Sequence, residues 1–212
     1  MSVQSGVMAP MDPAAPMQQM APMTADAVTF LLTWSLAMAA MMLPSEWPLF
    51  RLDYATARSG VRSVVLGAGY LAVWIALGGA VLVADRAADG RLLGSHRGAT
   101  VAVVLLAAAA FQLTPVKLRC LSVCRAPLAR VFHGWRDGLD GAFRMGVENG
   151  VWCMGCCVGL MAALLAVGMM SVIWMVVFAV AIFAEKATRA GVTASRVAAA
   201  ALAAGAVVAW AI

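Results

Sequence analysis

Charged side chains are scarce in this chain. Asp, Glu, Lys and Arg make up 12% of its 212 residues, whereas 64% of the residues are hydrophobic. A soluble domain is about one quarter charged and about one half apolar, so this composition excludes a soluble globular protein. Each membrane crossing needs roughly 20 apolar residues. The length therefore allows about five or six crossings within one membrane domain.

Histidine is almost absent as well. The chain has only His96 and His133, and neither lies in a recognisable motif. It also lacks a phosphate-binding glycine loop, a His-Glu-x-x-His zinc motif and a hydrolase nucleophile elbow. These absences favour a non-enzymatic role, and no catalytic residue is assigned. The basic pI, near 9.3, does not indicate nucleic acid, because basic residues in membrane proteins mark cytoplasmic loops.

Residues 1–26 contain no Lys or Arg. A secretory signal begins with a basic region, so we expect none here. The segment is rich in Met, Pro, Ala and Gln, and we expect it to be disordered. Its spaced methionines could capture Cu(I) on the outer side, although low-complexity drift is an equal alternative. These methionines are Met1, Met8, Met11, Met17, Met20 and Met23.

Residues 27–212 predict an all-α membrane bundle of six transmembrane helices. We expect Pro44 to end the first helix and Gly168–Ser171 to separate the fourth from the fifth. Twelve of the fifteen Lys and Arg residues then fall on one side, which the positive-inside rule makes cytoplasmic, with both termini outside. This predicts a multi-pass protein of the bacterial inner membrane. The expected crossings are about 27–43, 64–84, 99–116, 147–167, 171–186 and 195–212.

Three of the five cysteines occupy a single helical turn. Cys153, Cys156 and Cys157 follow the i, i+3, i+4 pattern that places side chains on one helix face. Thiolates bind Cu(I), Zn(II) and iron–sulfur clusters. The predicted topology puts all five cysteines near the reducing cytoplasmic face, which favours a ligand set over disulfides. Cys120 and Cys124, in the predicted loop between the third and fourth crossings, could complete this site or relay metal to it.

Met38, Met41 and Met42 repeat the same spacing at the cytoplasmic end of the first crossing. If that helix packs against the cysteine turn, thioethers would join thiolates in a pocket that suits low-coordinate Cu(I). Zinc, which remains possible, prefers four ligands. The alternative is ordinary packing, because Cys and Met both fill apolar cores. Closely spaced glycines around the cysteines, which allow tight helix contacts, fit that alternative.

Three carboxylates lie near the predicted inner interface: Glu46, Glu148 and Glu185. An ionisable group at the membrane is a candidate functional residue. For Glu185, an ion pair with a Lys or Arg is an equal possibility. Gln112 and Thr114 are the clearly polar residues of the third crossing.

Four segments together resemble a bacterial family of predicted metal-binding integral membrane proteins, a domain of unknown function. The resemblance implies a six-span fold and a metal-related role, and it names no activity. In the family pattern a His-Gly pair precedes the cysteine turn, whereas this chain has Asn149-Gly150. Either the metal role is weaker in this member or the ligand set is all sulfur. The similar segments are Thr33–Ser45, Phe111–Cys120 with the following residues to Pro127, Arg144–Cys157 and Trp174–Lys186.

The sequence thus favours a soft-metal protein, with copper first, that transports metal or delivers it to a membrane metalloenzyme. A non-catalytic accessory subunit of a larger membrane complex is the alternative. Thiol redox chemistry ranks third, because it needs an accessible, reactive thiolate. The expected partners are the lipid bilayer and a membrane protein or a second copy of the chain.

Overall fold

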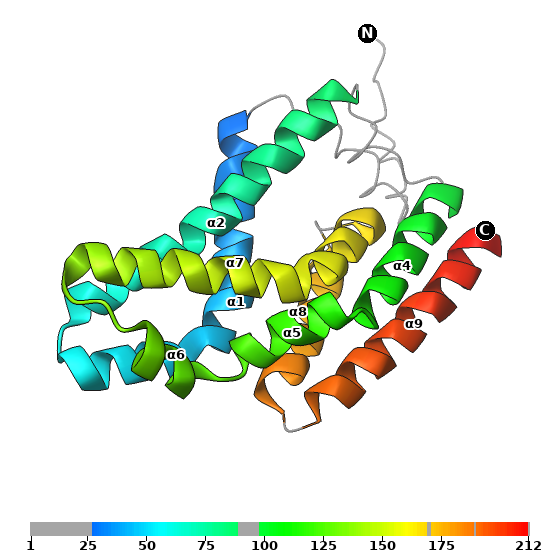
Figure 1. Cartoon of the computed structure of the whole chain (residues 1–212). Helices are drawn as coiled ribbons and strands as arrows, with labels where there is room; N and C mark the ends of the chain where they lie inside the picture. The colour runs from blue at the N-terminus through cyan, green and yellow to red at the C-terminus, as the bar shows by residue number, and fades with distance from the viewer. Residues whose placement is uncertain (1–26, 89–97, 169–170, 189, 212) are drawn as a thin grey trace, which may run out of the picture.

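The computed structural model describes residues 27–88, 98–168, 171–188 and 190–211, and these form α-helices without a strand. The predicted all-α class is confirmed. Residues 1–26 and His96 lie outside the described residues, and so do the predictions about them. The helices are α1 (Ala27–Ala57), α2 (Gly60–Ala87), α4 (Gly98–Gln112), α5 (Pro115–Cys124), α6 (Pro127–Gly134), α7 (Gly138–Val167), α8 (Val172–Ala187) and α9 (Gly191–Ala211) (Figure 1).

Four helices, α1, α2, α7 and α9, are long and apolar enough to cross a membrane. A fifth crossing results if α4 and α5 count as one span, although they meet at a bend of 66°. α8 has 16 residues, which extend about 24 Å against a hydrocarbon core of about 30 Å. Six crossings, and the side on which the termini lie, stay predictions.

The prediction that Pro44 ends the first helix is wrong, because α1 continues through Pro44 and Pro48 to Ala57. Proline removes a backbone donor and usually bends a helix. Membrane helices tolerate it when neighbouring helices and Ser or Thr side chains satisfy the freed groups. The carbonyls that lose a backbone donor here are those of Ala40 and Pro44, and the Ser45 hydroxyl bonds a different one, the carbonyl of Met42, at 2.8 Å. The extra turns carry Glu46 into the protein interior, where it is 4% exposed.

The third predicted crossing ends earlier than expected. α4 stops at Gln112, and α5 begins at Pro115 after a cap in which the Thr114 side chain accepts from the backbone N–H of Lys117. A Thr cap followed by Pro at the first helical position is a strong helix start. Cys120 and Cys124 therefore lie on a helix and not in a loop. The predicted break near Gly168 is confirmed, and that residue has a φ of 115°.

α7 is the central helix of the bundle and packs on α2, α5, α4 and α8 (Figure 1). Its closest approach is to α2. A Cβ at Gly146 would overlap the backbone carbonyl of Leu66, and one at Gly69 would overlap that of Phe143. Small residues of this kind let two membrane helices come into backbone contact. This contact sets the position of α7 against α2 two turns before the cysteine turn.

Replacing Gly146 with Ala should weaken the α2–α7 contact, because the added methyl group meets backbone that cannot rotate away. Overpacking of this kind costs about 1–3 kcal/mol. The control is Gly79→Ala, since a Cβ at the half-buried Gly79 has nothing within 4 Å and a helical Gly→Ala change stabilises by about 0.5–1 kcal/mol. Unfolding in SDS, followed by tryptophan fluorescence, measures both. Equal stability of the two variants would contradict the close contact.

Candidate metal centre

The three cysteines of α7 form a compact buried cluster. Their sulfur atoms all lie within 4.8 Å of one another, and the side chains are at most 1% exposed. The Sγ atoms of Cys156 and Cys157 are 3.4 Å apart, and the Cys156 thiol also donates to the Cys153 carbonyl at 3.1 Å. The helical spacing therefore produces the convergence of sulfurs that it predicted.

Cys153 has two polar neighbours that hydrogen-bond to its sulfur. The Lys186 ammonium, from α8, donates to it at 2.9 Å, and the Tyr70 hydroxyl, from α2, lies 3.0 Å away. An ammonium and a hydroxyl both stabilise sulfur in its anionic form. Cys153 is thus the thiol best placed to act as a thiolate ligand.

A buried ionic chain continues from Cys153 to α1. Lys186 also donates to Glu46 Oε1 at 2.7 Å and to the Ser45 hydroxyl at 3.1 Å. The other carboxylate oxygen of Glu46 accepts from the Asn149 side-chain amide at 2.7 Å. Lys186 is 8% exposed and Asn149 is 2% exposed. Buried charges must be paired and hydrogen-bonded, and here the partners come from three helices, α1, α7 and α8.

Sequence reasoning found only part of this network. It singled out Glu46 as a carboxylate near the interface, but it did not join Glu46 to Lys186 or to Cys153. It did not consider Tyr70, although a tyrosine in an apolar span is a usable signal, since a buried hydroxyl needs a partner. Asn149 was viewed as a missing nitrogen ligand. The structure shows it as the amide that positions Glu46.

The other two cysteines lie beside the cluster on α5. The sulfur of Cys124 is 3.8 Å from that of Cys156. A Cβ added at Gly155 would lie 2.7 Å from the sulfur of Cys120. Cys124 is half-buried and Cys120 is 9% exposed. Cys124 thus extends the cluster toward a half-buried position, and Cys120 lies against α7 at Gly155.

The methionine stripe of α1 is buried in the same core as the cysteines, with Met42 fully inaccessible. α1 packs mainly on α2, and to a smaller extent on α6 and α8. Its established link to the cysteine turn is Glu46. A ligand role for Met38, Met41 and Met42 therefore stays a prediction.

A second buried ion pair joins α8 to α5, on a different face of α8 from Lys186. Lys117 Nζ donates to Glu185 Oε2 at 2.7 Å, and the Gln112 amide donates to Glu185 Oε1 at 3.0 Å and accepts from Lys117. The expected pairing of Glu185 with a basic residue is thus observed. Glu185 faces α4 and α5, whereas its neighbour Lys186 faces α1 and α7.

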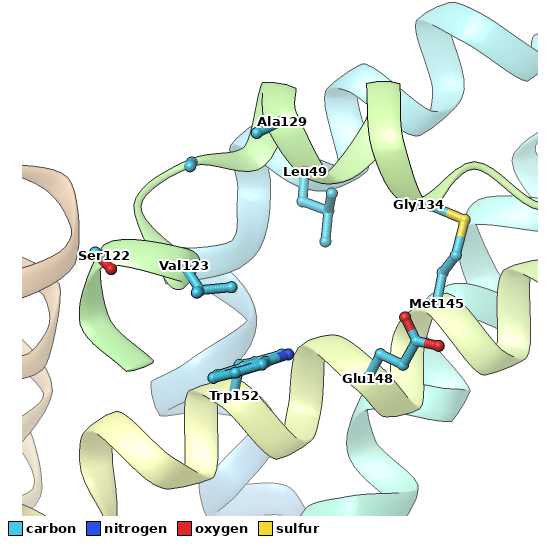
Figure 2. A pocket seen from close by; sticks show the side chains of 9 residues that line it. Leu49, Ser122, Val123, Ala129, Gly134, Met145, Glu148 and Trp152 are labelled. Carbon is cyan, nitrogen blue, oxygen red and sulfur yellow. The ribbon is translucent and has the colours of Figure 1, made fainter. Parts of the chain in front are cut away.

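Glu148, the third predicted carboxylate, is away from the cluster. It pairs with Arg136 at 2.7 Å, and both side chains are nearly half exposed. Figure 2 shows Glu148 and Trp152 of α7 lining a cavity of about 450 Å³ together with Val123 and Leu49. The lining includes Val123, the residue before Cys124 in the chain, but the described lining contains no cysteine. It is therefore separate from the thiol cluster.

The burial of the thiols predicts their order of reactivity. In folded protein in mild detergent, a bulky maleimide should modify Cys124 first, because the other four side chains are buried. Cys153, Cys156 and Cys157 should react only after unfolding in SDS, which serves as the control that all five are reduced. Peptide mapping by mass spectrometry gives the order. Early labelling of Cys153 would contradict the described packing.

The chain matches a known protein family. A family model described as "PpoB2: Copper chaperone" matches residues 31–209. No curated protein and no solved structure matches. The match includes all five cysteines, the ionic chain around Cys153 and every helix from α2 to α8. Because the model covers most of the 212 residues, the chain belongs to this copper chaperone family.

Proposed function

We propose that this chain is an integral membrane copper chaperone that holds Cu(I) on Cys153, Cys156 and Cys157 and delivers it to a membrane metalloenzyme. One observation supports this most: three buried thiols converge within 4.8 Å in a member of a copper chaperone family. Copper is the cargo in this proposal, and the chain performs no reaction on it.

The donor set favours Cu(I) over other soft ions. Three thiolates around an ion at about 2.3 Å would be about 4 Å apart, and the sulfurs already lie within 4.8 Å. Cu(I) accepts two or three sulfur ligands, whereas zinc prefers four. The hydrogen bonds that join Cys153 to Lys186 and Tyr70 hold one ligand in place before metal arrives. Little rearrangement is then needed on binding.

Cys124 is the proposed point of entry or exit. It is half-buried, and its sulfur lies 3.8 Å from Cys156, close enough for a copper ion to bond to both during transfer. Cys120, one turn earlier on α5, would assist this exchange. We include Met38, Met41 and Met42 as supporting thioethers near the site.

The proposed location is the bacterial inner membrane, with the cysteines toward the cytoplasmic face. Four long apolar helices support membrane insertion. So do large apolar side chains on the outer surface of the bundle, such as Leu36, Val64 and Ile173, which are 72–75% exposed. In water such a surface would drive association, whereas in lipid it is solvated. The recipient of copper would be a membrane partner within reach of Cys124.

Removing the three α7 thiols should abolish copper binding. Wild-type protein, reduced and loaded under anaerobic conditions, should retain about one Cu(I) per chain after competition with a chromophoric Cu(I) chelator. The Cys153→Ser, Cys156→Ser, Cys157→Ser triple variant should retain none, since a hydroxyl is a poor ligand for a soft ion. Met145→Leu, a core change outside the proposed ligands, is the control. Absence of copper from the wild type would contradict the proposed function.

Cys124→Ser should slow the transfer of copper without changing how much copper the protein holds. Because Cys124 lies outside the three-thiol cluster, the equilibrium amount of bound Cu(I) should remain within about twofold of wild type. The rate at which a Cu(I) chelator extracts the metal should fall at least tenfold, since the exchange step has lost its accessible sulfur. Stopped-flow absorbance of the chelator complex measures this rate, with Ser122→Ala as the control on the same helix. An unchanged rate would rule out Cys124 as the exchange residue.

A further inference from the structure

Lys186 places a fixed positive charge against the thiol cluster. Its Nζ lies 2.9 Å from the sulfur of Cys153 and 2.7 Å from Glu46 Oε1. The side chain is also hydrogen-bonded to Ser45 at 3.1 Å, so three acceptors from two helices hold the ammonium in position. A metal-binding site does not need a cation beside its ligands, because a fixed cation repels the arriving metal ion.

We infer that Lys186 makes the site selective for a monovalent ion and excludes divalent ions such as Zn(II). This inference rests on the proposed copper function, because it concerns which ion the same thiols accept. It assigns Lys186 as a specificity-determining residue that does not itself bind the metal.

The first reason is charge. The repulsion between the ammonium and a bound ion is proportional to the charge of that ion, so Zn(II) meets twice the repulsion that Cu(I) meets at the same position. Solvent screening does little to reduce this difference, because Lys186 and Cys153 are 8% and 0% exposed.

The second reason is that the carboxylate nearest to the thiols is already occupied. Zinc in proteins is almost always bound by four ligands, and a carboxylate oxygen is a usual one. Glu46 is the carboxylate linked to the cluster, but one oxygen is held by Lys186 and the other by Asn149. Lys186 therefore stands between Cys153 and the oxygen that could complete a zinc site. Cu(I) needs only the sulfurs.

The other buried lysine offers a matched comparison. Lys117 is also buried, at 0% exposed, and it is paired with Glu185 at 2.7 Å, on a different face of α8 from Lys186. Neutralising this pair alters the same amount of buried charge in the same region. It leaves the contacts of Cys153 with Lys186 and Tyr70 intact.

The test compares Cu(I) and Zn(II) affinities of the purified full-length chain by competition with chromophoric chelators. Cd(II) titration, read from the ultraviolet sulfur-to-cadmium charge-transfer band, reports a divalent ion on the thiolates directly. Lys186→Met should raise the Zn(II) affinity relative to Cu(I) at least tenfold, because it removes the repulsion and releases Glu46. Lys186→Arg should keep the wild-type preference, since the charge remains.

A second variant guards against failure to fold, because Lys186→Met leaves Glu46 buried without its counter-ion. The Glu46→Gln, Lys186→Met double variant removes both charges and keeps the contact with Asn149. It should show a smaller gain in Zn(II) affinity than Lys186→Met, since repulsion is lost without a new oxygen ligand. The Lys117→Met, Glu185→Gln double variant should keep the wild-type ratio of affinities.

The outcomes separate the two claims. If the wild type binds Cu(I) but both Lys186→Met variants keep its Zn(II)-to-Cu(I) ratio, the selectivity inference is wrong and the copper function stands. A ratio that rises equally in the Lys117→Met, Glu185→Gln variant would also overturn the inference, since any lost ion pair would then suffice. If the wild type binds no Cu(I), the proposed function and this inference fail together.

Discussion

The buried ammonium of Lys186 connects the parts of this protein that matter for its function. It joins α8 to Glu46 on α1 and to Cys153 on α7, while Asn149 and Tyr70 close the network from α7 and α2. A charge in an apolar interior is stable only when its partners are in place. The positions of four helices around the thiols are therefore coupled through this one group.

The sequence order of α8 explains how the site is held from two sides. Glu185 and Lys186 are adjacent, so their side chains point to different neighbours of the helix. Glu185 reaches Lys117 on α5, the helix that also carries Cys120 and Cys124. The same turn of α8 thus fixes the thiol cluster on α7 and the helix that bears the accessible thiol. A shift of α8 would alter both the storage site and the proposed route to it.

Local spacing predicted the sulfur cluster, because three cysteines at i, i+3 and i+4 must share one face of any helix. The all-α class followed from composition, and the break at Gly168 from a run too long for one crossing. The passage of α1 through Pro44 could not be predicted, since it depends on neighbouring helices. The partners of Cys153 were also out of reach: Tyr70 and Lys186 lie 83 and 33 residues away in the chain, and only tertiary packing brings them to the sulfur.

The central claim is that copper in this protein is held by sulfur alone on the α7 turn. X-ray absorption at the copper K edge of the loaded, full-length chain tests it most directly. We expect Cu(I) with a shell of two or three sulfur atoms and no nitrogen or oxygen ligand. A shell dominated by nitrogen or oxygen, or a spectrum unchanged when Cys153, Cys156 and Cys157 are replaced by serine, would contradict it.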